Sequence, residues 1–166
     1  VVFYDQGNIA SSCRGWWLAR LFGHKNVCVL DGGLPEWLRQ NGALECGVPA
    51  PPTGAVPYQS QPNYRYLKGL GDMLECVQQR SNLILGGRSA DRFYGHVPEP
   101  RAGLASGHMP GAVNVPFKQL LNETNCFKSI ELLKKQFTEL GISSQTNVIT
   151  TCGSGMTASV LSFALC

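Results

Sequence analysis

The residues most suited to chemistry are one cysteine and the short loop that follows it. A β-branched run, residues 148–151, ends at Cys152, and Gly153, Ser154 and Gly155 precede an apolar helical segment. Glycines let successive backbone N–H groups point at one centre, and a helix N-terminus adds the positive end of its dipole. Both effects lower the pKa of a thiol, and the thiolate is the reactive form. The loop indicates a candidate nucleophile, while a buried and inert cysteine remains the alternative that it leaves open.

Length and composition describe a folded chain of ordinary size. The 166 residues and 18.0 kDa suit one domain, or one domain plus part of another. The net charge of +3 comes from scattered basic residues, so we expect neither nucleic-acid nor membrane partners. Seven cysteines without C-x-x-C spacing argue against a disulfide framework and a zinc site. We therefore expect no metal or cofactor, and a reducing compartment, cytoplasm or mitochondrion.

Strand-length and helix-length hydrophobic patterns alternate along the chain, which is typical of an α/β fold with a parallel sheet. Strands are predicted at residues 1–4, 27–30, 83–85, 112–115 and 148–151. Helices are predicted at residues 11–22, 34–40, 66 to about 81, 89–93 and 130–140, and from the loop after Cys152 to the last residue. Ser89 is predicted to cap the short helix that it begins.

A proline-rich segment divides the chain. Residues 46–63 contain five of the ten prolines and show no periodicity: Pro49, Pro51, Pro52, Pro57 and Pro62. We predict a linker there, with residues 1–45 as the C-terminal part of a first domain and residues 64–166 as a second domain. The first strand has no upstream partner and no strand follows the last helix, so we expect both domains to be incomplete in this chain.

An internal repeat supports this layout. Residues 2–11 can be aligned with residues 149–158, and both segments are predicted to form a strand, a turn with glycine and the start of a helix. Asp5 then occupies the position of Cys152. Two copies of one domain would explain the likeness, with the first copy lacking the nucleophile.

Several motifs resemble the two-domain rhodanese family. They are DRFYG at residues 91–95, PEPR at 98–101, SGHMPGA at 106–112, CGSGMTA at 152–158 and, for the end of the first domain, DGGLPEW at 31–37. They follow the order of that family and cover nearly the whole chain. The resemblance implies tandem rhodanese-like domains, each a parallel sheet with flanking helices. Gly153 and Ser154 are not basic, which is similar to the 3-mercaptopyruvate branch and unlike the thiosulfate branch.

The resemblance implies a sulfurtransferase. Cys152 would attack the sulfur of 3-mercaptopyruvate, become a persulfide and release pyruvate; a thiol acceptor such as thioredoxin, or cyanide, would collect the outer sulfur. Ser154 would position or protonate the substrate, or else only stabilise the turn. Arg92 and Arg101 would hold the substrate carboxylate, with a salt bridge as the alternative for each. The further substrate-binding residues implied are Gly153, Gly155, Met156 and Thr157.

Two positions, Gly86 and His108, are expected to affect the site without taking part in the chemistry, and several rival functions remain. Gly86 stands where the family usually has an aspartate, a change expected to loosen the site, and His108 is expected to lock the turn at residues 107–111. The rivals are a thiosulfate:cyanide sulfurtransferase and a catalytically silent module that carries persulfide or binds partners. A phosphatase is disfavoured because residues 153–162 contain no arginine or lysine. A nucleotide-binding loop is disfavoured because no Gly-Lys-Ser/Thr follows the glycines.

Overall fold

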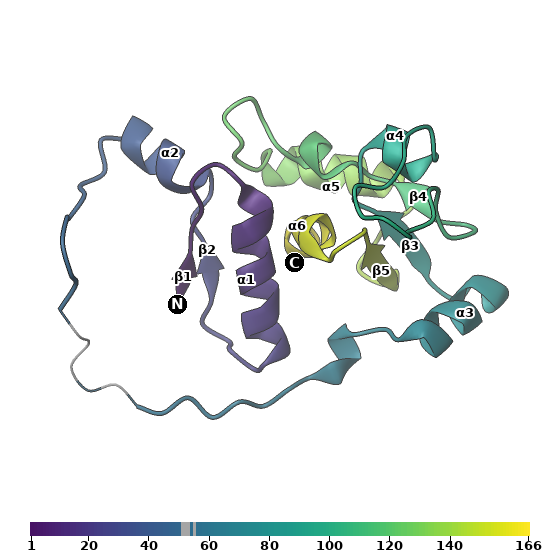
Figure 1. Ribbon diagram of the computed structural model, residues 1–166, viewed down its shortest axis with the longest axis horizontal. Helices are drawn as coiled ribbons and strands as arrows, with labels where there is room; N and C mark the ends of the chain where they lie inside the picture. Colours follow the sequence, from purple (N-terminus) through teal and green to yellow (C-terminus); the bar gives the residue numbers. More distant parts are fainter. Residues whose placement is uncertain (51–53, 55) are drawn as a thin grey trace.

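The structure is a computed structural model that describes residues 1–50, 54 and 56–166 (Figure 1). Strands and helices alternate along the chain, and every pair of named strands is parallel, which confirms the predicted α/β class. Pro51 and Pro52 of the predicted linker lie outside the described residues. The part of residues 46–63 that is described contains neither helix nor strand.

The elements fall into two groups along the sequence. The first contains β1 (Val2–Phe3), α1 (Ile9–Leu21), β2 (Cys28–Val29) and α2 (Gly33–Arg39). The second contains η1 (Tyr64–Tyr66), α3 (Leu70–Gln79), β3 (Leu83–Gly86), α4 (Ala90–Phe93), β4 (Val113–Asn114), η2 (Phe117–Leu120), α5 (Ile130–Glu139), β5 (Val148–Thr151) and α6 (Met156–Ala164). Here η marks a single 3₁₀ turn.

The second group forms a sheet in the order β4-β3-β5, with β3 in the centre. Leu85 pairs with Thr150 and Gly86 with Thr151, and the N–H of Gly87 donates to the carbonyl of Thr151 at 2.9 Å. The carboxyl ends of β3 and β5 therefore meet at one edge of the sheet. The segments after these strands, one leading to α4 and the other holding Cys152, emerge side by side, where ligands bind in open α/β sheets.

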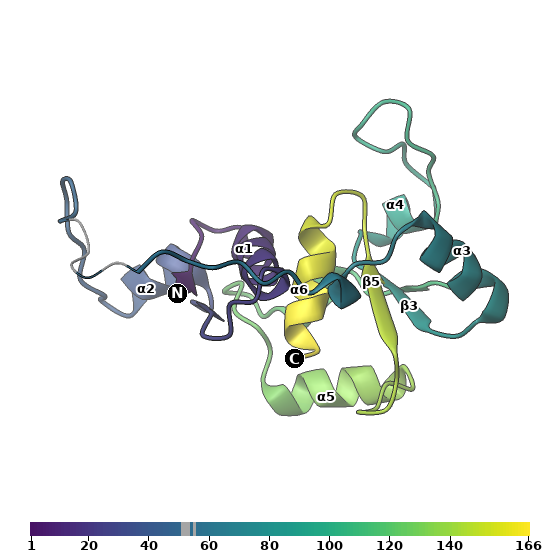
Figure 2. The same ribbon diagram turned by 90° about the horizontal axis from the view of Figure 1, so that it is seen from below.

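The two groups meet through α1 and α6, which pack against each other (Figures 1 and 2). On α6, the fully buried Leu161 belongs to a core with Leu85 and Phe137, whereas its neighbour Val160 belongs to a core with residues of α1. The ring of Trp16 on α1 meets the ring of Phe163 edge-on, with 5.0 Å between centroids. Two different faces of α6 thus pack against the two groups of elements, and this packing fixes the helix that follows the Cys152 loop.

Both segments of the predicted repeat form a strand, a loop and a helix. The unit β1, loop and α1 corresponds to the unit β5, loop and α6, and each helix follows a parallel strand. In the first copy Asp5 is buried; its carboxylate accepts from the N–H of Gly7 at 2.8 Å and from the hydroxyl of Ser12 at 2.5 Å. A carboxylate held by its own loop therefore stands where the second copy has Cys152.

Some predicted helix details were wrong. Tyr66 was predicted to begin a helix, yet it lies in a 3₁₀ turn and Leu67 is extended, with φ −109° and ψ 139°. The helix starts at Leu70, directly after Gly69, whose N–H donates to the carboxylate of Asp72 at 2.7 Å. Ser89 precedes α4 but its side chain makes no capping hydrogen bond, and α6 ends at Ala164. Periodic spacing marked the apolar faces but not the caps that set helix ends.

Candidate active site

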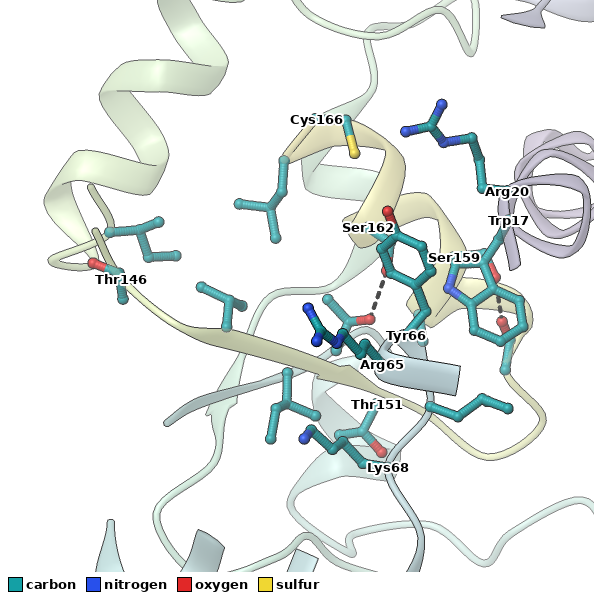
Figure 3. Close-up of a pocket in the computed structure, with 18 of the residues that line it drawn as sticks. Trp17, Arg20, Arg65, Tyr66, Lys68, Thr146, Thr151, Ser159, Ser162 and Cys166 are labelled. Carbon is teal, nitrogen blue, oxygen red and sulfur yellow. Dashed lines mark hydrogen bonds between the residues drawn. The ribbon is translucent and has the colours of Figure 1, made fainter. Parts of the chain in front are cut away.

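The loop from Cys152 to Gly155 joins β5 to α6. Gly155 has φ +82°, a left-handed conformation that side-chain-bearing residues seldom adopt, and it caps the start of α6. Its N–H donates to Sγ of Cys152 at 3.1 Å. The buried hydroxyl of Ser159, one turn into the helix, donates to the carbonyl of Gly155 at 2.7 Å (Figure 3). The loop is thus fixed to its helix with its amides turned toward the sulfur.

The electrostatics of the loop favour a thiolate. Burial by itself raises the pKa of Cys152, because a charge is poorly solvated there. Hydrogen bonds to the sulfur from the hydroxyl of Thr157 and from the backbone N–H groups of Ala158, Ser154 and Gly155 outweigh burial, so the pKa lies below its ordinary value. The sequence had predicted this direction from the glycines and the helix start. Cys152 is therefore suited to act as a nucleophile.

Cys13, on α1, shows the opposite behaviour. Burial, helped by the negative charges of Asp5 and Asp31, raises the pKa of Cys13 to about 12. Cysteine alone does not make a nucleophile; the loop amides distinguish the two sites.

Alkylation should separate these cysteines. Of the seven cysteines, we expect Cys152 to react first with iodoacetamide. Its alkylation rate should reach half of its maximum below about pH 8.5, where an ordinary thiol titrates. A lower pKa keeps the thiolate populated as pH falls, so the rate persists at lower pH. Peptide mapping by mass spectrometry across pH measures it, with Cys13 as the internal control. A midpoint at or above about 8.5, or equal labelling of Cys13, would contradict the assignment.

Arg92, on α4, reaches the same loop. A Cβ atom placed on Gly153 would lie 3.3 Å from Nη2 of Arg92 and 3.5 Å from Oε2 of Glu99. Hydrogen bonding to Glu99 raises the pKa of Arg92, and the charge of Cys152 adds to this effect. The structure therefore places a guanidinium beside the loop of the candidate nucleophile, paired with an acid that the sequence did not single out.

Of the other predicted site residues, three lie in or next to the Cys152 loop and Arg101 lies away from it. Ser154 lies exposed in the loop, and Met156 and Thr157 form the first turn of α6, half-buried. Arg101 is exposed in the segment between α4 and β4, which extends away from the sheet in Figure 2. Within the described residues, Arg101 makes no hydrogen bond or ion pair through its side chain. The structure thus gathers Cys152, its loop and Arg92, and leaves Arg101 in solvent.

Phe93 and His108 organise the base of α4. Nδ1 of His108 lies 2.9 Å from the carbonyl oxygen of Phe93, and the two rings stack with 4.0 Å between centroids. The Phe93 ring also covers Gly86, where a Cβ atom would come within 2.5 Å of it. An aromatic ring therefore fills the space beside Gly86, and His108 ties the turn at residues 107–111 to the helix that carries Arg92.

Replacing Phe93 by alanine should destabilise the chain. Phe93 is 2% exposed, and such a truncation typically lowers the free energy of unfolding by about 3–5 kcal/mol. The neighbouring and exposed Tyr94 is the control, since its replacement by alanine should cost less than about 1 kcal/mol. Urea unfolding of both variants measures the difference. Equal small losses would show that the ring does not hold α4 in place.

Sequence reasoning missed Arg14, which comes from α1. A Cβ atom placed on Gly155 would lie 2.9 Å from Nη1 of Arg14. The guanidinium carbon of Arg14 lies 4.7 Å from the centroid of the Trp17 ring. Arg14 also borders a cavity of about 610 Å³ whose other cations are Arg20, Arg65 and Lys68. Figure 3 shows Arg20 entering from α1, with Arg65 and Lys68 coming from the segment before α3. The loop therefore has positive charge on both flanks, Arg92 on one and Arg14 on the other.

Among the described residues, no group of three or more His, Cys, Asp or Glu side chains could hold a metal ion. No helix in the described ranges combines the length and the apolar character that crossing a membrane requires.

The chain is similar to known proteins in both sequence and fold. A family model described as a rhodanese-like domain matches residues 1–40. The 3-mercaptopyruvate sulfurtransferases of Homo sapiens and Escherichia coli K12 are each 38% identical, over 95% and 99% of this chain and 53% and 58% of their own. Rat thiosulfate sulfurtransferase is 37% identical over 99% of the chain and 56% of its own. The solved structure of the Escherichia coli 3-mercaptopyruvate sulfotransferase SseA is 35% identical, with a TM-score of 0.82 over 99% of this chain and 60% of that one.

The chain therefore spans a little over half the length of the curated relatives that it matches.

Proposed function

The chain belongs to the rhodanese family, and from that premise we propose that it is the part of a 3-mercaptopyruvate sulfurtransferase that carries the nucleophile. Sulfur would pass from 3-mercaptopyruvate to Cys152 and then to a thiol acceptor or cyanide, with release of pyruvate. The observation that carries this proposal is the loop itself, whose hydrogen bonds converge on Sγ of Cys152 and lower its pKa.

In the first transfer the Cys152 thiolate attacks the sulfur of 3-mercaptopyruvate. A sulfur–sulfur bond forms and the carbon–sulfur bond breaks, so the electron pair moves to carbon as the enolate of pyruvate. Protonation of that carbon gives pyruvate and leaves a persulfide on Cys152. Ser154, exposed at the tip of the loop, is proposed to position the substrate or to supply that proton.

The loop that stabilises the thiolate suits the persulfide anion as well. The N–H groups of residues 154, 155 and 158 and the hydroxyl of Thr157 point at the sulfur before any substrate arrives, so little reorganisation is needed. In the second transfer, a thiolate acceptor attacks the outer sulfur and Cys152 leaves as thiolate. Thioredoxin is the acceptor that we propose, and cyanide would give thiocyanate. Two separate transfers imply ping-pong kinetics.

The carboxylate of the substrate needs a cation near the loop. Arg92 lies against Gly153 and can grip a carboxylate through its planar fork. We propose Arg101 as the second cation; it would act by a movement of the segment between α4 and β4. The proposed substrate-binding surface also includes Gly153, Gly155, Met156 and Thr157. Cytoplasm and mitochondrion are the proposed compartments, and one Arabidopsis thaliana relative is named as mitochondrial.

Donor preference is the test of this proposal. The chain should release pyruvate from 3-mercaptopyruvate with a higher kcat/KM than it forms thiocyanate from thiosulfate and cyanide, because Gly153 and Ser154 supply no basic side chain for a dianion. Higher efficiency with thiosulfate would favour the activity for which the rat relative is named. Inactivity toward both donors in a chain that shows cooperative unfolding would favour a silent persulfide-carrying module.

A further inference from the structure

Glu99 is buried where its neighbours are not. It lies in the segment between α4 and β4, in which every other residue from Tyr94 to Ser106 is exposed. Its side chain is only 2% exposed. A carboxylate loses hydration when it is buried, so its burial in an otherwise solvated loop calls for strong partners.

Two arginines supply those partners. Nη1 of Arg88, just after β3, donates to Oε1 of Glu99 at 2.7 Å, and Nη2 of Arg92 donates to Oε2 at 2.5 Å. Nε of Arg92 also donates to Oε1, at 3.3 Å. Nη2 of Arg88 donates to the carbonyl oxygen of Gly107, so Arg88 holds the segment at two points. These contacts lower the pKa of Glu99, chiefly through the hydrogen bond from Arg92.

The pairing fixes the direction of the Arg92 guanidinium. Its Nε–Nη2 edge is occupied by Glu99, which leaves the donors of Nη1 and one of Nη2 for another ligand. Both Nη2 of Arg92 and Oε2 of Glu99 lie close to Gly153. The unoccupied donors of Arg92 are therefore held next to the loop that carries the nucleophile.

The net charge of Arg88, Arg92 and Glu99 also bears on which substrate anion can bind. Arg88 and Arg92 carry two positive charges and Glu99 one negative charge, which leaves one net positive charge beside Gly153. On the Gly153 side of the loop, this group therefore offers one positive charge to a monoanionic carboxylate such as that of 3-mercaptopyruvate, while Arg14 lies on the Gly155 side. Thiosulfate is a dianion and would gain more from a second uncompensated cation.

We propose that Glu99 is a positioning and specificity-determining residue, which orients Arg92 toward the substrate carboxylate and lowers the net positive charge on the Gly153 side of the loop to suit a monoanion. This inference rests on the proposed function, in which Arg92 binds that carboxylate. Arg88 is the anchor that holds Glu99 in place.

The principal test is a Glu99→Gln variant, which keeps the shape of the side chain and removes its charge. We expect KM for 3-mercaptopyruvate to rise about 10-fold or more with a smaller change in kcat, and the ratio of thiosulfate to 3-mercaptopyruvate efficiency to rise. The rate of Cys152 alkylation by neutral iodoacetamide should change less than about twofold, because the loop amides stabilise the thiolate. The matched control is Glu36→Gln, which breaks an exposed Glu36–Arg39 ion pair, also of 2.5 Å.

A double-mutant cycle separates positioning from a general structural role. If Glu99 acts through Arg92, Glu99→Gln should add nothing to KM once Arg92 is methionine. Full additivity of the two changes, or an unchanged KM and donor ratio in Glu99→Gln, would overturn the proposal. Glu99→Asp retains the charge and should keep the donor ratio of the parent chain, which gives a second variant if Glu99→Gln unfolds.

A binding measurement distinguishes failure of this inference from failure of the proposed function. Calorimetric titration of 3-mercaptopyruvate into Cys152→Ser chains, with and without Glu99→Gln, reports carboxylate binding without turnover. Weaker binding in the double variant supports the positioning role even where the parent chain releases no pyruvate, an outcome that would contradict only the proposed function. Equal binding, or no binding by either chain, overturns the positioning role.

Discussion

A Cys152→Ser variant should release no measurable pyruvate from 3-mercaptopyruvate, a fall of at least about 10³-fold. Hydrogen bonds from the loop lower the pKa of Cys152 below its ordinary value, so at a given pH more of this thiol is ionised than of an ordinary cysteine. A serine hydroxyl at the same position stays protonated and does not form the sulfur–sulfur bond that the proposed reaction requires. Steady-state pyruvate release, followed with a thiol acceptor present, measures the loss.

The control for this variant is Cys46→Ser, which changes an exposed cysteine outside the loop and should keep full activity. Both variants should unfold at the same urea concentration as the parent chain, since Cys152 is only half-buried. Substantial pyruvate release by folded Cys152→Ser protein would mean that another group accepts the sulfur.

The second large effect is expected at Arg92. Arg92→Met should raise KM for 3-mercaptopyruvate about 10- to 100-fold, since a charge-assisted hydrogen bond to a carboxylate contributes about 1.5–3 kcal/mol. Methionine keeps much of the length of the side chain and removes the fork. Initial rates over a range of 3-mercaptopyruvate concentrations give KM and kcat separately. The fall in kcat should be smaller than the rise in KM if Arg92 acts mainly in binding.

Arg39→Met is the matched control for this change, because Arg39 also donates to a glutamate at 2.5 Å but lies exposed on α2. It should leave KM unchanged. If Arg92→Met has the KM of the parent chain, Arg92 serves only to balance Glu99, and the carboxylate must bind to another cation such as Arg14.

The lowered pKa of Cys152 could be predicted because its determinants are local. The β-branched strand, the two glycines and the apolar helix lie within a few residues of Cys152, and each has a direct conformational consequence. The parallel α/β class followed from the alternation of elements for the same reason. The repeat of the strand-loop-helix unit around Asp5 was visible in the sequence because both copies use similar local signals.

The surroundings of the loop could not be predicted, because they depend on distant segments. Arg14 reads as a surface charge on a helix, and only the packing of α1 on α6 brings it to Gly155. Glu99 stands between two prolines in a segment that reads as exposed. Its burial arises from arginines at the end of β3 and on α4, whose positions depend on the sheet.

The start of α3 shows the same limit on a smaller scale. Tyr66 and Leu67 continue the helical spacing of apolar residues, but the capping contact at Gly69 sets the helix start. Side-chain periodicity reports which face is buried, whereas the end of a helix depends on backbone groups that need partners.

The proposed Cys152 persulfide is tested most directly by a single turnover in the absence of a sulfur acceptor. The chain is mixed with one equivalent of 3-mercaptopyruvate, pyruvate is measured, and the peptide containing Cys152 is examined by mass spectrometry. We expect up to one equivalent of pyruvate and the added mass of one sulfur atom on Cys152, which a thiol then removes. Pyruvate release with Cys152 unmodified, or sulfur found on another cysteine, would contradict a mechanism that passes through the Cys152 persulfide.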